Sequence, residues 1–144
     1  MDTGSIDDVL GEDHERIGHL LKAFAEAWRS GSPETPGLLL RIDQGLRAHI
    51  RWEEGALFPA VKERATAAER RSIESLEIDH VRIGETLEAL ATALASAGDV
   101  AGVLDQLDIY LKGHNYDEEH GVYVEADRYL SPEERKRLLG NFVP

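Results

Sequence analysis

The stretch HIRWEE at residues 49–54, with its counterpart HNYDEE at residues 114–119, decides the fold. Residues four apart on an α-helix lie on the same face, one above the other. In a helix, each stretch therefore presents an imidazole and a carboxylate in one direction, which is an arrangement that suits a metal ion. These pairs are His49 with Glu53 and His114 with Glu118.

The composition indicates one acidic, globular domain. A chain of 144 residues can bury a core of its own, so we expect residues 1–144 to form a single domain. Charged residues make up 31% of the chain and hydrophobic residues 42%, which is typical of a folded protein with a solvated helical surface. The net charge of −12 predicts no nucleic-acid partner and no binding to anionic membranes. The lack of cysteine excludes disulfides, thiolate metal sites and iron–sulfur clusters.

The sequence also predicts where the protein resides. Residues 1–5 lack the basic start and apolar run of a signal peptide. No apolar stretch approaches the roughly 20 residues that a membrane-spanning helix needs. We therefore expect a cytoplasmic protein with no membrane partner. We also expect it to be a monomer or a weak homodimer.

Caps and breakers predict the first two helices. Ser5, followed three residues later by an aspartate, begins a helix over residues 6–29. A cluster of glycine and proline separates it from a second helix over residues 38–64. Pro59 lies inside this second helix, so we expect a kink or a loosened turn just after Glu53.

Two further long helices and a short one follow. Thr66 begins the third helix and Gly98 is its predicted stop. Asp99 caps the fourth helix, whose stripe of inward residues runs as far as Tyr129. The SPEE sequence at residues 131–134 begins a short terminal helix. The predicted fold is all-α, an up-down-up-down four-helix bundle with a short C-terminal helix.

An internal repeat relates the two halves of the chain. At a shift of 66 residues, the segment 10–27 matches the segment 76–93 at ten of eighteen positions. At a shift of 65 residues, the stretch 49–54 falls on 114–119. Two helical hairpins of the same design predict a bundle with a pseudo-twofold axis.

Six polar residues occupy positions that the helical period assigns to the core. A single buried histidine is common, but two buried carboxylates beside four imidazoles are costly without compensating positive charge. A pair of divalent or trivalent cations supplies that charge and uses the nitrogen and oxygen donors. At a rise of about 1.5 Å per residue, the four histidines reach the same level of the bundle. The six residues are His14, His49, Glu53, His80, His114 and Glu118.

These residues resemble the haemerythrin-like (HHE cation-binding) domains over nearly the whole chain, and the LFP sequence at residues 57–59 is also similar to that family. The resemblance implies two non-haem iron ions joined by an oxo or hydroxo bridge. By that likeness the four histidines are terminal ligands, and the two glutamates, Glu53 and Glu118, are bridges.

The sequence departs from the oxygen-carrying haemerythrins at one ligand. Those proteins have a fifth histidine four residues after the third-helix ligand, where this chain has Gly84, and Gly18 holds the matching place on the first helix. Glycine inside a helix costs about 1 kcal/mol against alanine, so we consider two roles: space beside each iron, or close packing of helices. On the fourth helix, Glu119 is an alternative to Glu118 as ligand, although the period favours Glu118. Tyr110 lies one turn before His114, where an edge-of-core position is the simpler interpretation.

The resemblance predicts a di-iron protein that binds or reacts with O2, NO or peroxide, with oxidative or nitrosative stress as its setting. Weak catalase- or peroxidase-like activity or chemistry with NO would fit, and an oxygen-binding, sensing or iron-storage module without catalysis is the alternative. Repair of iron centres is disfavoured because the repair proteins usually carry a cysteine-bearing N-terminal domain. A ferritin-like oxidase is disfavoured because Glu-x-x-His occurs before His80 but not before His14 or His49.

Overall fold

All of the regular structure in residues 4–144, the part of the chain that the computed structural model describes, is helical. Residues 1–3 lie outside the described part, which therefore leaves out most of residues 1–5, the stretch compared above with a signal peptide. Within residues 4–144, no helix combines the length and apolarity that crossing a membrane requires. The helical segments are α1 (Ile6–Arg29), α2 (Thr35–Trp52), the π-helix η1 (Glu53–Leu57), α3 (Phe58–Lys62), α4 (Ala67–Ser96), α5 (Val100–Glu119), α6 (Val122–Tyr129) and α7 (Pro132–Leu139).

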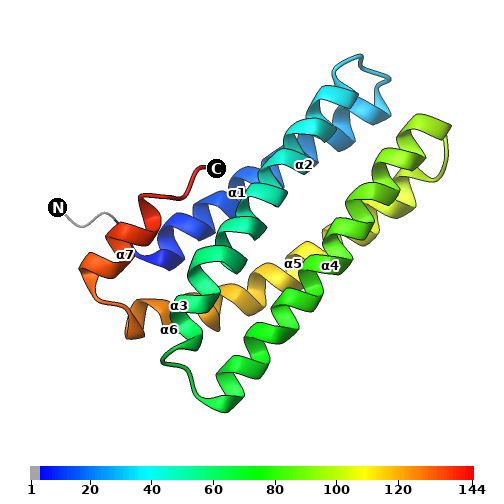
Figure 1. Cartoon of the computed structure of the whole chain (residues 1–144). Helices are drawn as coiled ribbons and strands as arrows, with labels where there is room; N and C mark the ends of the chain where they lie inside the picture. Colours follow the sequence, from blue (N-terminus) through cyan, green and yellow to red (C-terminus); the bar gives the residue numbers. More distant parts are fainter. Residues whose placement is uncertain (1–3) are drawn as a thin grey trace.

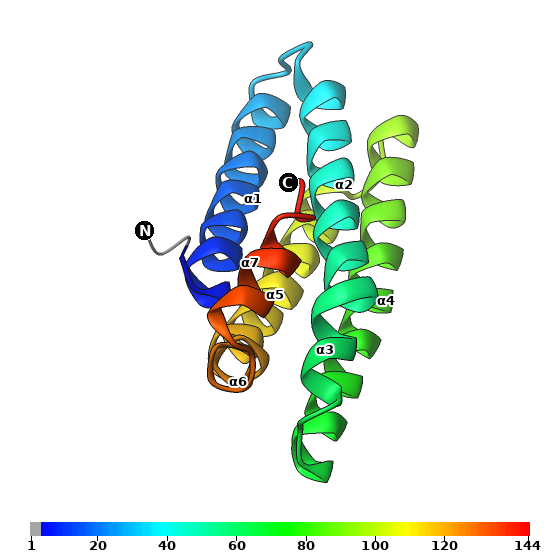
Figure 2. The same ribbon diagram turned by 60° about the vertical axis from the view of Figure 1, so that its left-hand side comes forward.

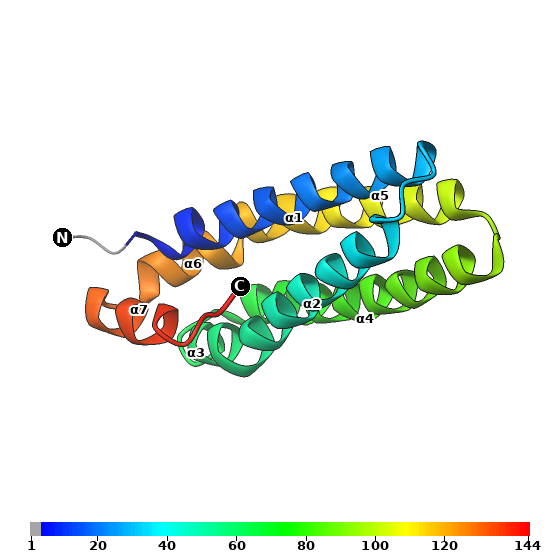
Figure 3. The ribbon, with the colours of Figure 1, turned by 90° about the horizontal axis from the view of Figure 1, so that it is seen from above.

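The long helices run up and down, as predicted. α1 pairs with α2 and α4 pairs with α5, and the turns that join each pair lie at the same end of the bundle (Figure 1). Seen from above, α1 lies beside α5 and α2 beside α4 (Figure 3). At the other end, α7 turns back between α1 and α2, where Trp52 donates from Nε1 to the Leu138 carbonyl oxygen at 3.1 Å (Figure 2). The predicted four-helix bundle with a short C-terminal helix is confirmed.

Side-chain caps fix where the helices begin. The Ser5 hydroxyl accepts from the backbone N–H three residues further on, at 3.0 Å. Thr66 and Ser131 each form a full capping box with the glutamate three residues later. These predicted starts are confirmed, but the end of the third helix differs. Ala97, with a φ of 54°, takes the left-handed position that the sequence predicts for Gly98.

The second long helix is widened before Pro59. Glu53–Leu57 form a π-helix, in which the Phe58 N–H bonds to the Glu53 carbonyl oxygen, five residues back. Proline has no N–H and its ring clashes with the carbonyl oxygen four residues before it, so a regular α-helix is disfavoured here. The predicted irregularity after Glu53 is confirmed, and it takes the form of a π-helical turn.

The fourth helix is broken, contrary to the continuous stripe predicted as far as Tyr129. α5 ends before His120 and α6 starts after Gly121. A Cβ at Gly121 would lie 2.8 Å from the Asp117 carbonyl oxygen, so only glycine fits this turn without a shift of the backbone. The break changes the direction in which the side chains of α6 point, and this matters for Tyr123.

Two apolar clusters fill the bundle, one on each side of the predicted metal-binding level. α1, α2 and α4 contribute to both clusters and change from one to the other at their histidine, whereas α5 contributes to one and α6 to the other. The loop-end cluster includes Phe24, Ile42, Leu90 and Leu107. The α6-end cluster includes Leu10, Phe58, Ile73 and Tyr123.

Candidate metal centre

The structure brings the side chains of all six predicted residues together between the two apolar clusters. Each long helix supplies one histidine, while the carboxylates come from η1 and from the last turn of α5. Glu53 and Glu118 are fully buried, with 0% of either residue exposed. The histidines are almost as buried, and even the most exposed of them, His14, keeps only 8% of its side chain accessible.

The donor atoms form two groups that share a glutamate. In one group, Nε2 of His14 lies 3.1 Å from Oε1 of Glu118. In the other, Nε2 of His80 lies 3.3 Å from Oε1 of Glu53 and Nε2 of His114 lies 3.2 Å from Oε1 of Glu118. Each group could hold one ion, since its donor atoms lie within 4.8 Å of one another. The groups are His14, His49 and Glu118, and Glu53, His80, His114 and Glu118.

A second carboxylate lies at the outer nitrogen of every histidine. Nδ1 of His49 lies 2.7 Å from Asp13, and Nδ1 of His80 lies 2.7 Å from Glu54. Histidines that bind metals commonly donate from the other ring nitrogen to a carboxylate, which fixes the ring and leaves Nε2 for the ion. His114 repeats this arrangement, whereas Nδ1 of His14 approaches its carboxylate without a hydrogen bond. Nδ1 of His114 is 3.1 Å from Asp79 and Nδ1 of His14 is 3.5 Å from Glu119.

Sequence reasoning did not identify these outer carboxylates, although the internal repeat contained the signal. Asp13 and Asp79 hold equivalent positions in the alignment of the two halves, and so do Glu54 and Glu119. Each one serves a histidine on a neighbouring helix, so the pseudo-twofold relation extends to this layer. The structure places Glu118 between the histidines, and places Glu119 at the edge with 35% of its side chain exposed.

Tyr123 is the other residue of the centre that sequence reasoning missed. The residue is fully buried, and its hydroxyl donates to Oε2 of Glu53 at 2.6 Å. The hydroxyl oxygen of Tyr123 also lies 3.1 Å from Oε1 of Glu118 and 3.1 Å from Nε2 of both His14 and His49. A continuous helix would have placed Tyr123 about 180° from His114, because nine residues at about 100° each make two and a half turns.

The electrostatics of the centre couple histidine to carboxylate. Burial would lower the pKa of His49, but the Glu53 carboxylate and the hydrogen bond to Asp13 outweigh it and raise the pKa to about 10. Burial likewise opposes the charge on His114, and Glu118 overcomes it to give a pKa of about 9. For Glu53, burial raises the pKa, but the surrounding histidines hold it well below its ordinary value. Without metal, protons on the histidines balance the charge of the carboxylates.

The donor atoms fit a cation. Three buried atoms on the α4 side have no hydrogen-bond partner: Oε1 of Glu53, Oε2 of Glu118 and Nε2 of His80. A buried acceptor without a partner is costly, and the two carboxylates together carry two negative charges. Mixed imidazole and carboxylate donors suit iron, zinc and other transition metals.

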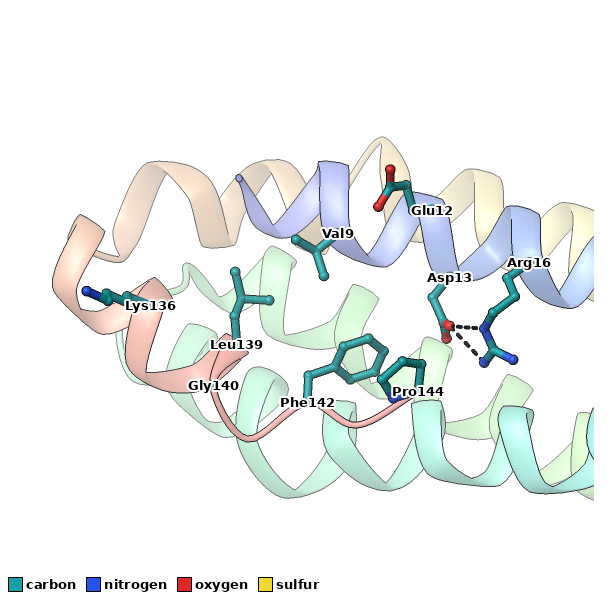
Figure 4. A pocket seen from close by; sticks show the side chains of 9 residues that line it. All are labelled: Val9, Glu12, Asp13, Arg16, Lys136, Leu139, Gly140, Phe142 and Pro144. Atoms are coloured by element: carbon teal, nitrogen blue, oxygen red, sulfur yellow. Dashed lines mark hydrogen bonds and ion pairs between the residues drawn. The ribbon is translucent and has the colours of Figure 1, made fainter. Parts of the chain in front are cut away.

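The surroundings of the two ends of the centre differ. Beside His49, the C-terminal segment covers the surface, and the Phe142 ring packs edge-on with its centroid 6.0 Å from that of His49. Figure 4 shows Phe142 and Pro144 between α1 and α2, next to a cavity of about 720 Å³ that reaches Asp13. The pseudosymmetric surface at His114 has no such cover among the described residues and holds a cavity of about 190 Å³, also lined by Tyr110.

The two glycines considered above have no close neighbours. A Cβ at Gly18 would meet nothing within 4 Å, and one at Gly84 would meet only Nη1 of Arg47, at 3.9 Å. Close helix packing therefore does not explain either glycine. Gly18 is exposed, so it provides no space beside the centre.

One of three comparisons with known proteins found a match. A comparison with curated proteins found no match, and a comparison with solved structures found none either. Among protein families, the one described as the hemerythrin HHE cation binding domain matches residues 5–126, which include all six predicted ligands. The chain therefore belongs to the hemerythrin HHE cation-binding domain family.

Proposed function

We propose that this protein holds two iron ions and that the pair reacts with a small oxidant, namely O2, NO or peroxide. The observation that carries the proposal is the position of the two buried carboxylates. Glu53 directs Oε2 towards His49 and Oε1 towards His80, at 3.5 and 3.3 Å. A carboxylate with one oxygen towards each of two histidine groups would suit a pair of ions, one held by each group.

The residues of the chain have separate roles in this proposal. His14 and His49 would hold one ion, and His80 and His114 the other. Iron supplies one-electron redox chemistry and Lewis acidity when bound. The carboxylates neutralise its charge, their partners on Nδ1 orient the rings, and the apolar clusters exclude bulk water.

The test combines metal analysis with peroxide turnover. Protein produced with abundant iron should contain about two iron ions per chain and should consume added peroxide over many turnovers. Glu53→Gln should lose at least one ion and the turnover, because the amide cannot bridge. The control Glu88→Gln removes a carboxylate that is 75% exposed and should change neither.

Three outcomes separate the candidates. One tightly bound zinc per chain after iron-rich production would contradict the di-iron proposal. Two irons whose absorption is bleached once by peroxide, without turnover, would favour the storage or sensing module. Two irons with sustained peroxide consumption would support an oxidant-reactive centre.

A further inference from the structure

We propose that the Tyr123 hydroxyl oxygen is a ligand of the ion held by His14 and His49, and that Phe58 leaves the other ion open to small molecules. The inference rests on the proposed function, since it assigns unequal roles to the two metal positions. It concerns a residue outside the set of four histidines and two glutamates.

The hydroxyl of Tyr123 lies among donor atoms on every side. It is within 3.1 Å of one oxygen of each bridging glutamate and of Nε2 of both histidines. These are the atoms that would face an ion in this half. At these distances the phenol touches them directly, so an ion bound by His14 and His49 must contact this oxygen or displace the ring.

The pseudo-twofold repeat shows what the other half lacks. When the alignment of 49–54 with 114–119 is continued along the chain, Tyr123 corresponds to Phe58. The Phe58 ring stacks on His80 with centroids 5.6 Å apart, and the Tyr123 ring stacks on His14 at the same separation. Both rings are buried. The two halves therefore differ at this place by a single hydroxyl.

The inward-facing buried atoms without partners follow the same division, whereas Nδ1 of His14, which also lacks a hydrogen-bond partner, faces outwards to Glu119. Oε1 of Glu53, Oε2 of Glu118 and Nε2 of His80 belong to the half in which Phe58 offers no hydroxyl. In the Tyr123 half, the phenol donates its one proton to Glu53, and the facing oxygen of Glu118 lies 3.1 Å from the phenol oxygen. An ion beside Phe58 would thus keep a coordination position that the Phe58 side chain cannot fill. When the Tyr123 oxygen binds its ion, its O–H bond is broken and the proton leaves to solvent.

The experiment uses the visible spectrum of ferric protein, because phenolate bound to ferric iron has a charge-transfer band and resonance-enhanced tyrosine vibrations. The wild-type protein should show both. Tyr123→Phe should lose both while retaining about two irons. The control Tyr110→Phe removes the hydroxyl of the tyrosine near His114 and should keep both signals. Phe58→Tyr should add a second contribution to the charge-transfer band, since the new hydroxyl would point at the ion held by His80 and His114.

The outcomes separate this inference from the function it rests on. A wild-type protein with two irons and no tyrosine vibrations would overturn the ligand assignment and leave the di-iron proposal intact. The assignment is also wrong if Tyr123→Phe keeps the charge-transfer band. It is wrong as well if Tyr123→Phe binds two irons and the wild type binds one, because Tyr123 would then exclude an ion. Fewer than two irons in both proteins would contradict the di-iron proposal itself. Circular dichroism on each variant checks that the bundle is folded.

Discussion

Each histidine of the centre lies between two carboxylates, one at each ring nitrogen. Asp13 is the most constrained of the outer four, since only 3% of its side chain is exposed and Arg16 also bonds to it at 2.8 Å. Burial raises the pKa of Asp13, but the bonds from His49 and Arg16 outweigh it and lower the pKa below the ordinary value. A charged carboxylate at this position holds the His49 ring so that Nε2 faces the centre.

Replacing that carboxylate should weaken metal binding without removing a ligand. Asp13→Asn keeps the size of the side chain but loses its charge, so we expect a loss of metal affinity of about 10- to 100-fold. Competition with a chelator measures it. Asp43→Asn is the control, because Asp43 pairs with Arg47 on the surface, away from the centre. Equal affinities in the two variants would show that the outer carboxylate does not support the ligand.

At this scale the sequence predicted the inward residues but not their partners. Neighbouring residues on a helix point about 100° apart, so Asp13 cannot face the same way as His14. Its side chain instead reaches His49 on the adjacent helix, at 2.7 Å. Periodicity within one helix carries no information about such contacts, which depend on how the helices pack.

At the scale of elements, both helices that carry a His-x-x-x-Glu pair are interrupted just after the glutamate. The π-helix η1 widens the second long helix, and the turn at Gly121 breaks the fourth. The interruptions differ in kind but have one result: Phe58 and Tyr123, at equivalent positions, both stack on histidines of the centre. The interruptions therefore help to build the site.

The turn at Gly121 should be sensitive to a single methyl group. Gly121→Ala places a Cβ 2.8 Å from the Asp117 carbonyl oxygen, so the backbone must shift, and we expect a loss of about 1–3 kcal/mol in the free energy of unfolding. The shift should also displace Tyr123. Gly18→Ala is the matched control, because its Cβ would meet no atom within 4 Å, and it should gain about 0.5–1 kcal/mol. Urea unfolding of both variants gives the comparison, and equal stabilities would refute it.

Helix starts with a side-chain cap were predictable because a cap is local: Ser5, Thr66 and Ser131 each bond to residues within three positions. The second helix has no such cap, and it begins at Thr35, three residues before the predicted start. The break at Gly121 was not, because Val122 and Tyr129 continue the apolar period across it. The pattern of apolar side chains does not reveal a break in the helix when the spacing of the apolar residues continues across it. For the same reason, the sequence did not predict that Tyr123 points inwards.

At the scale of the whole molecule, a polar layer divides the core into two apolar clusters. Folding must bury Glu53 and Glu118 in that layer, and the chain compensates them in two ways: with protons on the histidines or with metal ions. The sequence pattern pointed to metal ions as the source of the positive charge that balances the carboxylates. The carboxylates also raise the pKa values of His49 and His114, so protons on these two histidines are a second source of positive charge.

This exchange predicts how the stability of the protein without metal depends on pH. His49 and His114 have folded pKa values of about 10 and about 9, above the ordinary value of 6.5. Their protons therefore stabilise the fold fully below about pH 6.5, and that contribution is lost as the pH rises towards 9–10. In the loaded protein, ions take the place of the protons, so no such loss should occur.

The midpoint of thermal unfolding of chelator-treated protein should consequently fall between about pH 7 and about pH 10, while that of the loaded protein stays nearly level. The difference between the two midpoints should widen across this range. On the acid side the lowered pKa of Glu53 gives the opposite sign, because its contribution is present above about pH 4.5 and is lost as the pH falls further. Protons also compete with metal for the histidines there, so the loaded and chelator-treated midpoints should converge in acid. Midpoints that stay parallel from neutral to alkaline pH would show that the histidines are not the counter-charges of Glu53 and Glu118.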